Sequence, residues 1–213
     1  MQILNTMSAN VHLRTNPKLV DGVIAEIQQR LAAQIEWFTN IYGRVERLKE
    51  EVDGQTYYTA NVYKSGNDYT LIAPDSGLGN FAFFTVDEPE DVEQYIGEPV
   101  RIQSPCSLIV WVDLRTIPNG ENRNTEAVKN EILHALNSLY LRYGRFYISK
   151  IYNRAESIFK GFSLDEVNNQ FLMQPYCGWR FEGEIDFVAD CVEPEPEPTP
   201  EPEPEPDVEP ENP

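Results

Sequence analysis

The stretch Gln174–Val188, QPYCGWRFEGEIDFV, has the clearest strand pattern in the chain. From Trp179 onward the odd-numbered positions are apolar or glycine. Charged residues occupy the even-numbered positions, Arg180, Glu182, Glu184 and Asp186. Because side chains alternate between the two faces of a strand, this pattern predicts one face against a core and the other against water or a partner. The rest of the fold is expected to be built around this closing strand.

Two stretches have the three- and four-residue spacing of apolar side chains that is typical of amphipathic helices. The first helix is expected over residues 18–37. The second begins with Thr125 as its cap and ends before Tyr143. The polar face of the first helix, which includes Gln28, is expected to lie in water.

Alternating or dense apolar residues predict the strands of a sheet. These strands are expected over residues 44–52, 56–63, 69–72, 81–86, 107–115 and 145–153, followed by the closing strand. The first of them also fits a helix, but Asp53-Gly54 directly behind it is typical of a hairpin turn and favours a strand. The sequence therefore predicts an α+β fold, with a mostly antiparallel sheet packed by two main helices.

Three phenylalanines fall within four residues of one predicted strand, at Phe81, Phe83 and Phe84. They cannot all lie on one side of a strand, so both faces of this strand are expected to be covered. The second cover is either another part of the same chain or another subunit.

The chain divides into three parts by composition. Residues 1–17 read as an N-terminal arm, and residues 18–192 as a single α+β domain. Residues 193–213 contain 8 Glu, 1 Asp and 9 Pro, with neither Lys nor Arg. Such a segment cannot form a packed core, so we expect a disordered acidic tail rich in proline.

Charge and motifs argue against several classes of function. The formal net charge is −18, which opposes binding to nucleic acid phosphates. The two histidines and three cysteines have no metal-ligand spacing, and Gly77-Leu78-Gly79 lacks the lysine of a phosphate-binding loop. No run of 18 apolar residues occurs. We predict no catalytic residue, cofactor or metal, no enzyme activity and no membrane association.

Seven aromatic residues lie on predicted strands or beside turns, and each of them either completes the core or belongs to an interface. They are Tyr57, Tyr58, Tyr63, Tyr69, Phe84, Trp111 and Tyr176.

The order of elements, the run NVYKSGNDYTLIAPDSGLGNFAFFTV and the ending FLMQPYCGWRFEGEIDFV resemble the tail terminator or tail-completion proteins of tailed bacteriophages, the group around minor tail protein U. The resemblance covers about residues 15–190. The chain departs from it in the loop over residues 87–99 and in the Glu-Pro tail. These departures affect the expected position in the phage neck and the number of copies.

The resemblance implies a structural virion protein that forms a ring with copies of itself, commonly a hexamer, at the head-tail junction. Its implied partners are portal or connector proteins and tail proteins, with DNA passing through the ring without specific binding. It would be assembled in the host cytoplasm and kept in the neck or tail of the virion. The alternative is an acidic cytosolic adaptor or assembly chaperone for a basic partner. The acidic composition of the tail favours this alternative.

Under the ring hypothesis, the charged row of the closing strand becomes a candidate subunit-facing or lumen surface. The candidate residues are Phe84, Trp111, Arg180, Glu182 and Glu184.

Overall fold

The computed structural model describes residues 9–65, 68–96, 98–118, 124–137, 141–142, 144–165 and 167–189. The predicted Glu-Pro tail and residues 1–8 of the predicted N-terminal arm lie outside these ranges. The described part of that arm contains strand β1 (Asn10–His12).

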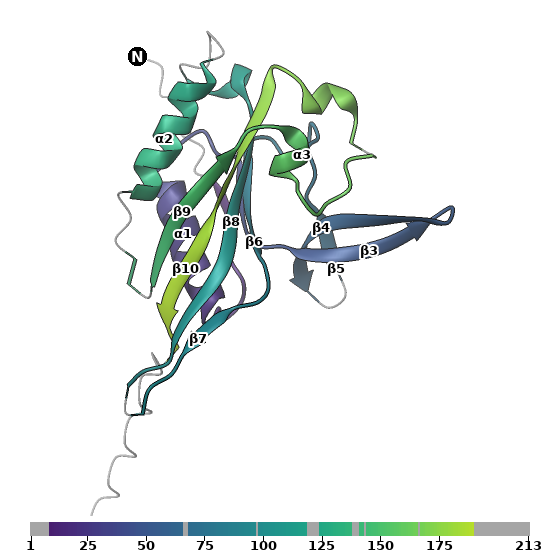
Figure 1. The fold of residues 1–213 in the computed structure, drawn as a ribbon. Helices are drawn as coiled ribbons and strands as arrows, with labels where there is room; N and C mark the ends of the chain where they lie inside the picture. The colour runs from purple at the N-terminus through teal and green to yellow at the C-terminus, as the bar shows by residue number, and fades with distance from the viewer. Residues whose placement is uncertain are drawn as a thin grey trace, which may run out of the picture.

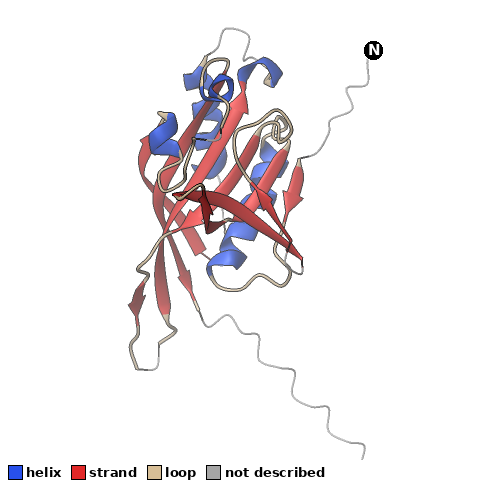
Figure 2. Ribbon diagram, turned by 90° about the vertical axis from the view of Figure 1, so that its right-hand side faces the viewer, coloured by secondary structure: helices blue, strands red, loops and turns tan. Residues whose placement is uncertain are grey.

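The chain folds into a seven-stranded sheet and a separate three-stranded sheet, with helices on both faces of the larger one (Figures 1 and 2). The predicted α+β fold is confirmed. The larger sheet contains β1, β2 (Asn40–Arg44), β6 (Phe81–Val86), β7 (Asp91–Glu93), β8 (Arg101–Asp113), β9 (Gly144–Tyr152) and β10 (Tyr176–Val188). The smaller sheet contains β3 (Glu46–Val52), β4 (Gln55–Ser65) and β5 (Asp68–Leu71). The α-helices are α1 (Val20–Gln34), α2 (Thr125–Asn137) and α3 (Ala155–Ile158).

The larger sheet has the strand order β1-β2-β6-β8-β10-β9, and β7 pairs with the first residues of β8. The β1-β2 and β2-β6 pairs are parallel, and the other pairs are antiparallel. Among the described residues, β1 and β9 are therefore the two edges of the main path.

Strands β8 and β10 form the centre of the sheet. They pair in one continuous antiparallel register, from Tyr176 opposite Asp113 to Val188 opposite Arg101. Strand β10 is the closing strand predicted from the sequence. Its apolar face lies in the core as predicted, but Arg180 and Asp186 on the charged face are buried as well.

The first hydrophobic core lies between this sheet and helices α1 and α2. The apolar stripe of α1, from Val20 to Leu31, is buried against the apolar face of β10 and against Phe84. At about 1.5–3 kcal/mol for each large apolar side chain, this burial is the main stabilising contribution to the fold.

A second core covers the opposite face of β6 and β8. Here Phe81, Phe83 and Trp111 pack in one cluster with Phe159 and with Ala60 of the smaller sheet. The prediction that both faces of β6 are covered is confirmed, and the second cover comes from the same chain: α3, the residues that follow it and the smaller sheet.

Gln28 is an exception to the predicted helix pattern. Its side chain is buried, and its Nε2 group donates hydrogen bonds to the carbonyl oxygens of His12 and Ile41, each at 3.1 Å. The prediction that Gln28 lies in water is therefore wrong, because the amide joins α1 to β1 and β2 instead.

The two local signals at element ends had different outcomes. The Asp53-Gly54 hairpin is confirmed, with φ of 51° and 77° between β3 and β4. Thr125 is already the first residue of α2, and the side chain of Asn124 accepts the hydrogen bond of the Ala127 backbone N–H. The cap is thus one residue earlier than predicted, because an asparagine oxygen also serves this role well.

Residues 87–100 form a projection that we call the arm. It is distinct from the N-terminal arm of residues 1–17. It leaves the body of the sheet beyond the end of β6, includes β7 and returns into β8 (Figures 1 and 2). The arm corresponds to the loop that the sequence marks as an addition to the tail terminator pattern.

The close approach of β9 to β10 at Gly183 gives the first prediction. A Cβ atom at this position would collide with the backbone carbonyl of Tyr147 next to a β-bulge. We expect Gly183→Ala to lower the free energy of unfolding by about 2–4 kcal/mol in a urea titration.

The control is Gly22→Ala, where the nearest atom is 3.7 Å away and the residue lies in a helix. This variant is expected to be as stable as the wild type or up to about 1 kcal/mol more stable. Equal stability of the two variants would contradict the described contact between β9 and β10.

Candidate functional site

Two of the five predicted surface residues are part of the cores. Phe84 is buried against the helices, and Trp111 is buried in the second core with its ring centroid 5.3 Å from that of Phe159. The prediction that they lie on a subunit or lumen surface is wrong for the folded chain. The cause is that elements distant in sequence cover both faces of β6 and β8.

Arg180 is also buried, with a side chain that is only 3% exposed. Its guanidinium group lies 3.4 Å from the Asp87 carboxylate and 3.8 Å from the Glu182 carboxylate. It also donates a hydrogen bond to the carbonyl oxygen of Lys160 at 3.3 Å. Arg180 is therefore an internal cation, not a surface group, and it joins β10 to the start of the arm and to the chain behind α3.

Glu182 and Glu184 differ although they lie on the same strand. Glu182 is half-buried and accepts from Lys150 at 3.5 Å and from the Tyr152 hydroxyl at 3.4 Å, next to Arg180. Glu184 is exposed. Of the predicted charged row, Glu184 alone has an open position, and Glu182 belongs to an ion-pair network.

Asp186, at the end of this row, is held by Arg101 of β8. The Nε group of Arg101 donates to one carboxylate oxygen at 2.8 Å, and its second nitrogen donates to the other oxygen. These hydrogen bonds keep the pKa of the Asp186 carboxyl below its ordinary value. Such a two-point contact fixes the direction of both side chains.

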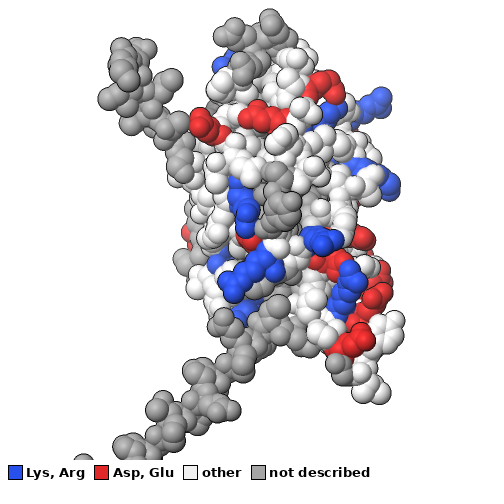
Figure 3. Space-filling view, turned by 90° about the vertical axis from the view of Figure 1, so that its left-hand side faces the viewer, with Lys and Arg blue, Asp and Glu red and all other residues white. Residues whose placement is uncertain are grey.

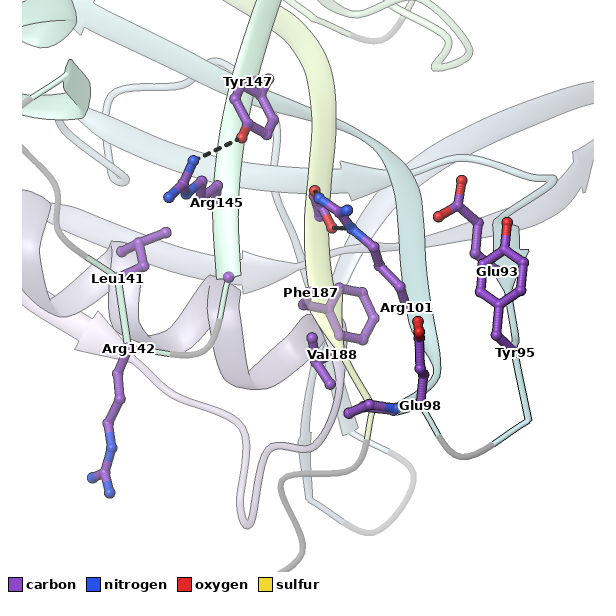
Figure 4. A pocket seen from close by; sticks show the side chains of 13 residues that line it. Glu93, Tyr95, Glu98, Arg101, Leu141, Arg142, Arg145, Tyr147, Phe187 and Val188 are labelled. Carbon is purple, nitrogen blue, oxygen red and sulfur yellow. Dashed lines mark hydrogen bonds and ion pairs between the residues drawn. The ribbon is translucent and has the colours of Figure 1, made fainter.

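A hollow of about 700 Å³ lies between the arm and the start of β9 (Figure 4). The arm contributes Glu93 and Tyr95, and β9 contributes Arg145 and Tyr147, which hydrogen-bond to each other at 3.3 Å. Figure 4 shows Arg142 at its margin, pointing away from the strands. The residues that line the hollow carry both signs of charge, with Glu93 and Glu98 on the arm and Arg101 and Arg145 on the strands.

Charge is unevenly distributed over the folded part. Residues 141–155 contain four basic residues and no acidic one, whereas residues 87–98 of the arm contain six acidic residues and no basic one. Figure 3 shows basic side chains across the middle and along the upper right of one face, with acidic side chains at the top and at the lower right. Two surfaces of opposite sign are thus present on one chain.

The arm also exposes apolar side chains. Val92 is 60% exposed, Tyr95 is 65% exposed, and Ile96 is fully exposed. Three large apolar side chains close together at the end of a projection are typical of a contact surface. The sequence shows this group as V-E-Q-Y-I between acidic residues, but only the projection of the arm distinguishes it from core residues.

A smaller apolar pocket of about 270 Å³ lies between the smaller sheet and residues 159–171. Its walls include Leu71, Phe162 and Phe171, with Asp75 at the margin. The Asp75 carboxylate already accepts hydrogen bonds from the backbone N–H groups of Gly77 and Leu78. This arrangement stabilises the turn that follows Asp75.

The two thiols in the described part of the chain and the two histidines have the following surroundings. Burial raises the pKa of Cys106, and it raises the pKa of Cys177 to about 12, so neither thiol is an activated nucleophile. His12 stacks on Tyr42 with ring centroids 4.3 Å apart, and His134 lies exposed on α2. Within the described ranges, no group of three or more His, Cys, Asp or Glu side chains could hold a metal ion.

Two further findings concern membranes and known proteins. No helix in the described part of the chain is long and apolar enough to cross a membrane. Comparison of the chain with protein-family models, with curated proteins and with solved structures gave no match.

The difference between the two glutamates gives a second prediction. Glu182→Lys places a third cation beside Arg180 and Lys150, so we expect it to lower the free energy of unfolding by about 2–4 kcal/mol. Glu184→Lys changes the same charge at an exposed position and is expected to stay within about 0.5 kcal/mol of the wild type. Thermal and urea unfolding measure both, and similar losses in the two variants would contradict the network around Arg180.

The Arg101–Asp186 contact gives a third prediction. Because the folded pKa of Asp186 is lowered, the contact stabilises the fold above the ordinary carboxyl pKa of about 4 and loses this effect as pH falls through the folded pKa. We therefore expect Arg101→Gln to be less stable than the wild type at pH 7, with a difference that shrinks below pH 4.

Urea titrations from pH 7 to pH 2.5 measure this difference. The control is Lys49→Gln, which removes an ion pair to Glu51 that is exposed on both sides and contributes little. A wild-type advantage over Arg101→Gln that stays constant down to pH 2.5 would contradict the lowered pKa.

Proposed function

We propose that this chain is a structural subunit of a tailed bacteriophage particle that assembles with copies of itself into a ring at the head-tail junction. In this role it joins the portal or connector to the tail and lets DNA pass through the ring without specific binding. The phage assignment comes from the resemblance of the sequence to tail terminator proteins. It would be assembled in the host cytoplasm and kept in the neck or tail.

The observation that carries the assembly part of this proposal is the arm. Its apolar residues Val92, Tyr95 and Ile96 are exposed on a projection from the body of the sheet. Within the described chain, strand β7 of this projection pairs with β8 alone. Exposed apolar groups of this kind lose contact with water when a neighbouring subunit covers them.

The two edges of the larger sheet also support assembly. Strands β1 and β9 lie at opposite ends of the main path and differ in length, charge and neighbours. A closed ring needs contacts between unlike surfaces of neighbouring copies, and a chain with distinct flanks supplies them.

Acidic charge supports the passage of DNA. The formal net charge of −18 repels phosphates, so a ring of such subunits would not retain DNA in its channel. Of the charged residues predicted for a lumen surface, Glu184 is exposed and could face the DNA.

Labelling of purified virions tests the proposed place of the protein. Antibodies against the chain are expected to bind at the neck in electron micrographs, between the head and the tail. Virions that lack the chain altogether would contradict the proposal.

Deletion of residues 193–213 separates this function from that of an acidic adaptor. A ring subunit is expected to assemble without the Glu-Pro segment, whereas an adaptor that binds a basic partner through it would lose that partner. Loss of a co-purifying basic protein, with a monomeric wild type, would favour the adaptor.

A further inference from the structure

We propose that the arm of one copy of this chain lies along the free edge of strand β9 in a second copy, and that this contact repeats around the ring. The proposal rests on the ring function and names the two surfaces that join neighbouring subunits. The molecule that occupies the β9 edge is a second copy of the same chain.

The β9 edge is open to another strand. Strand β9 has nine residues and, within the described part of the chain, pairs with β10 alone. Its outer N–H and C=O groups can therefore bond an extended segment from another molecule. Tyr147 and Ile151 on this strand are 40–45% exposed and offer apolar contact to the incoming segment.

Charge selects the arm as that segment. The β9 region has Arg145, Lys150 and Arg154 with no acidic residue between residues 141 and 155, and the arm has six acidic residues and no basic one. Two β9 edges would repel each other, which discourages pairing through like edges. An acidic arm is attracted, and its exposed Tyr95 and Ile96 match the apolar residues of the edge.

The arm cannot make this contact within its own chain. Strands β8 and β10 lie between β7 and β9, which separates the arm strand from β9 by about 14 Å at roughly 4.8 Å per strand. Main-chain pairing needs adjacent strands about 4.8 Å apart, so β7 cannot pair with β9 of its own chain. Lys150 already pairs with Glu182, whereas Arg145 and the nearby Arg154 make no ion pair within the described residues and are available to a neighbour. The contact then joins unlike surfaces as a ring requires.

The size of the contact favours closure over a simple dimer. The arm has 14 residues and β9 has nine, fewer than the roughly 20–30 residues per side of a stable two-protein interface. One contact alone would be weak. A closed ring gives each subunit two such contacts, and the last one forms at high effective concentration.

Two charge-reversed proteins test the contact. The arm variant is Asp91→Lys with Glu98→Lys, and the edge variant is Arg145→Glu with Arg154→Glu. Both acidic residues are exposed, and no ion pair is observed for either within the described chain. At 50 mM salt, each variant alone is expected to need at least tenfold more protein than the wild type for half-assembly in sedimentation velocity.

An equimolar mixture of the two variants supplies the decisive result. A reversed arm then meets a reversed edge, and a normal arm meets a normal edge, so assembly is expected to return with the two proteins alternating. Only even copy numbers can form in the mixture. General repulsion or misfolding would not be repaired by mixing.

Matched controls change the same number of charges on other exposed positions. These are Lys18→Glu with Lys49→Glu, and Glu50→Lys with Glu51→Lys, and both are expected to assemble like the wild type. Circular dichroism melts of all the variants establish that each one folds.

The outcomes separate the contact from the ring. If the wild type assembles and the two folded variants assemble equally well, the arm contact is overturned and the ring stands. A mixture that stays monomeric although both variants fold also overturns the arm contact. A wild type that is monomeric at all concentrations overturns the ring and the arm contact together.

Discussion

The pairing of β8 with β10 is the constraint on which the rest of the structure depends. Thirteen consecutive residues of each strand pair in one register, so each face of this ribbon is fixed over its whole length. One face carries the apolar residues that α1 and α2 cover, and the other carries the second core at one end and charged groups at the other. The same ribbon places β9 on one side and the arm on the other, which separates the two proposed contact surfaces.

Arg180 marks the point where the second face changes from apolar to polar. A buried guanidinium group without partners would cost several kcal/mol, and here the carboxylates of Asp87 and Glu182 and a backbone carbonyl offset that cost. Because Asp87 is the first residue of the arm, the direction in which the arm leaves the sheet is tied to the centre of β10. We infer that the network around Arg180 positions the arm rather than a ligand.

The sequence predicts the elements with strong local signals and misses those set by distant contacts. The alternation of β10, the apolar stripe of α1 and the Asp53-Gly54 turn are all local, and the structure confirms them. Strand β2 lacks such a signal because it has five residues and its middle three are all buried, so polar and apolar residues do not alternate along it. Alternation assigned Arg180 to the polar face correctly but could not show that the segment behind α3 covers it, and the same limit applies to Trp111.

The central proposal is that copies of this chain form a closed ring through unlike surfaces, and it is argued from the projecting arm and the open β9 edge. Native mass spectrometry of the purified wild type over a range of concentrations tests it most directly. The account predicts one dominant assembly with a single copy number, in equilibrium with monomer and with few intermediates, as ring closure requires. A chain that remains monomeric at every concentration, or a ladder of open oligomers without a preferred number, would contradict it.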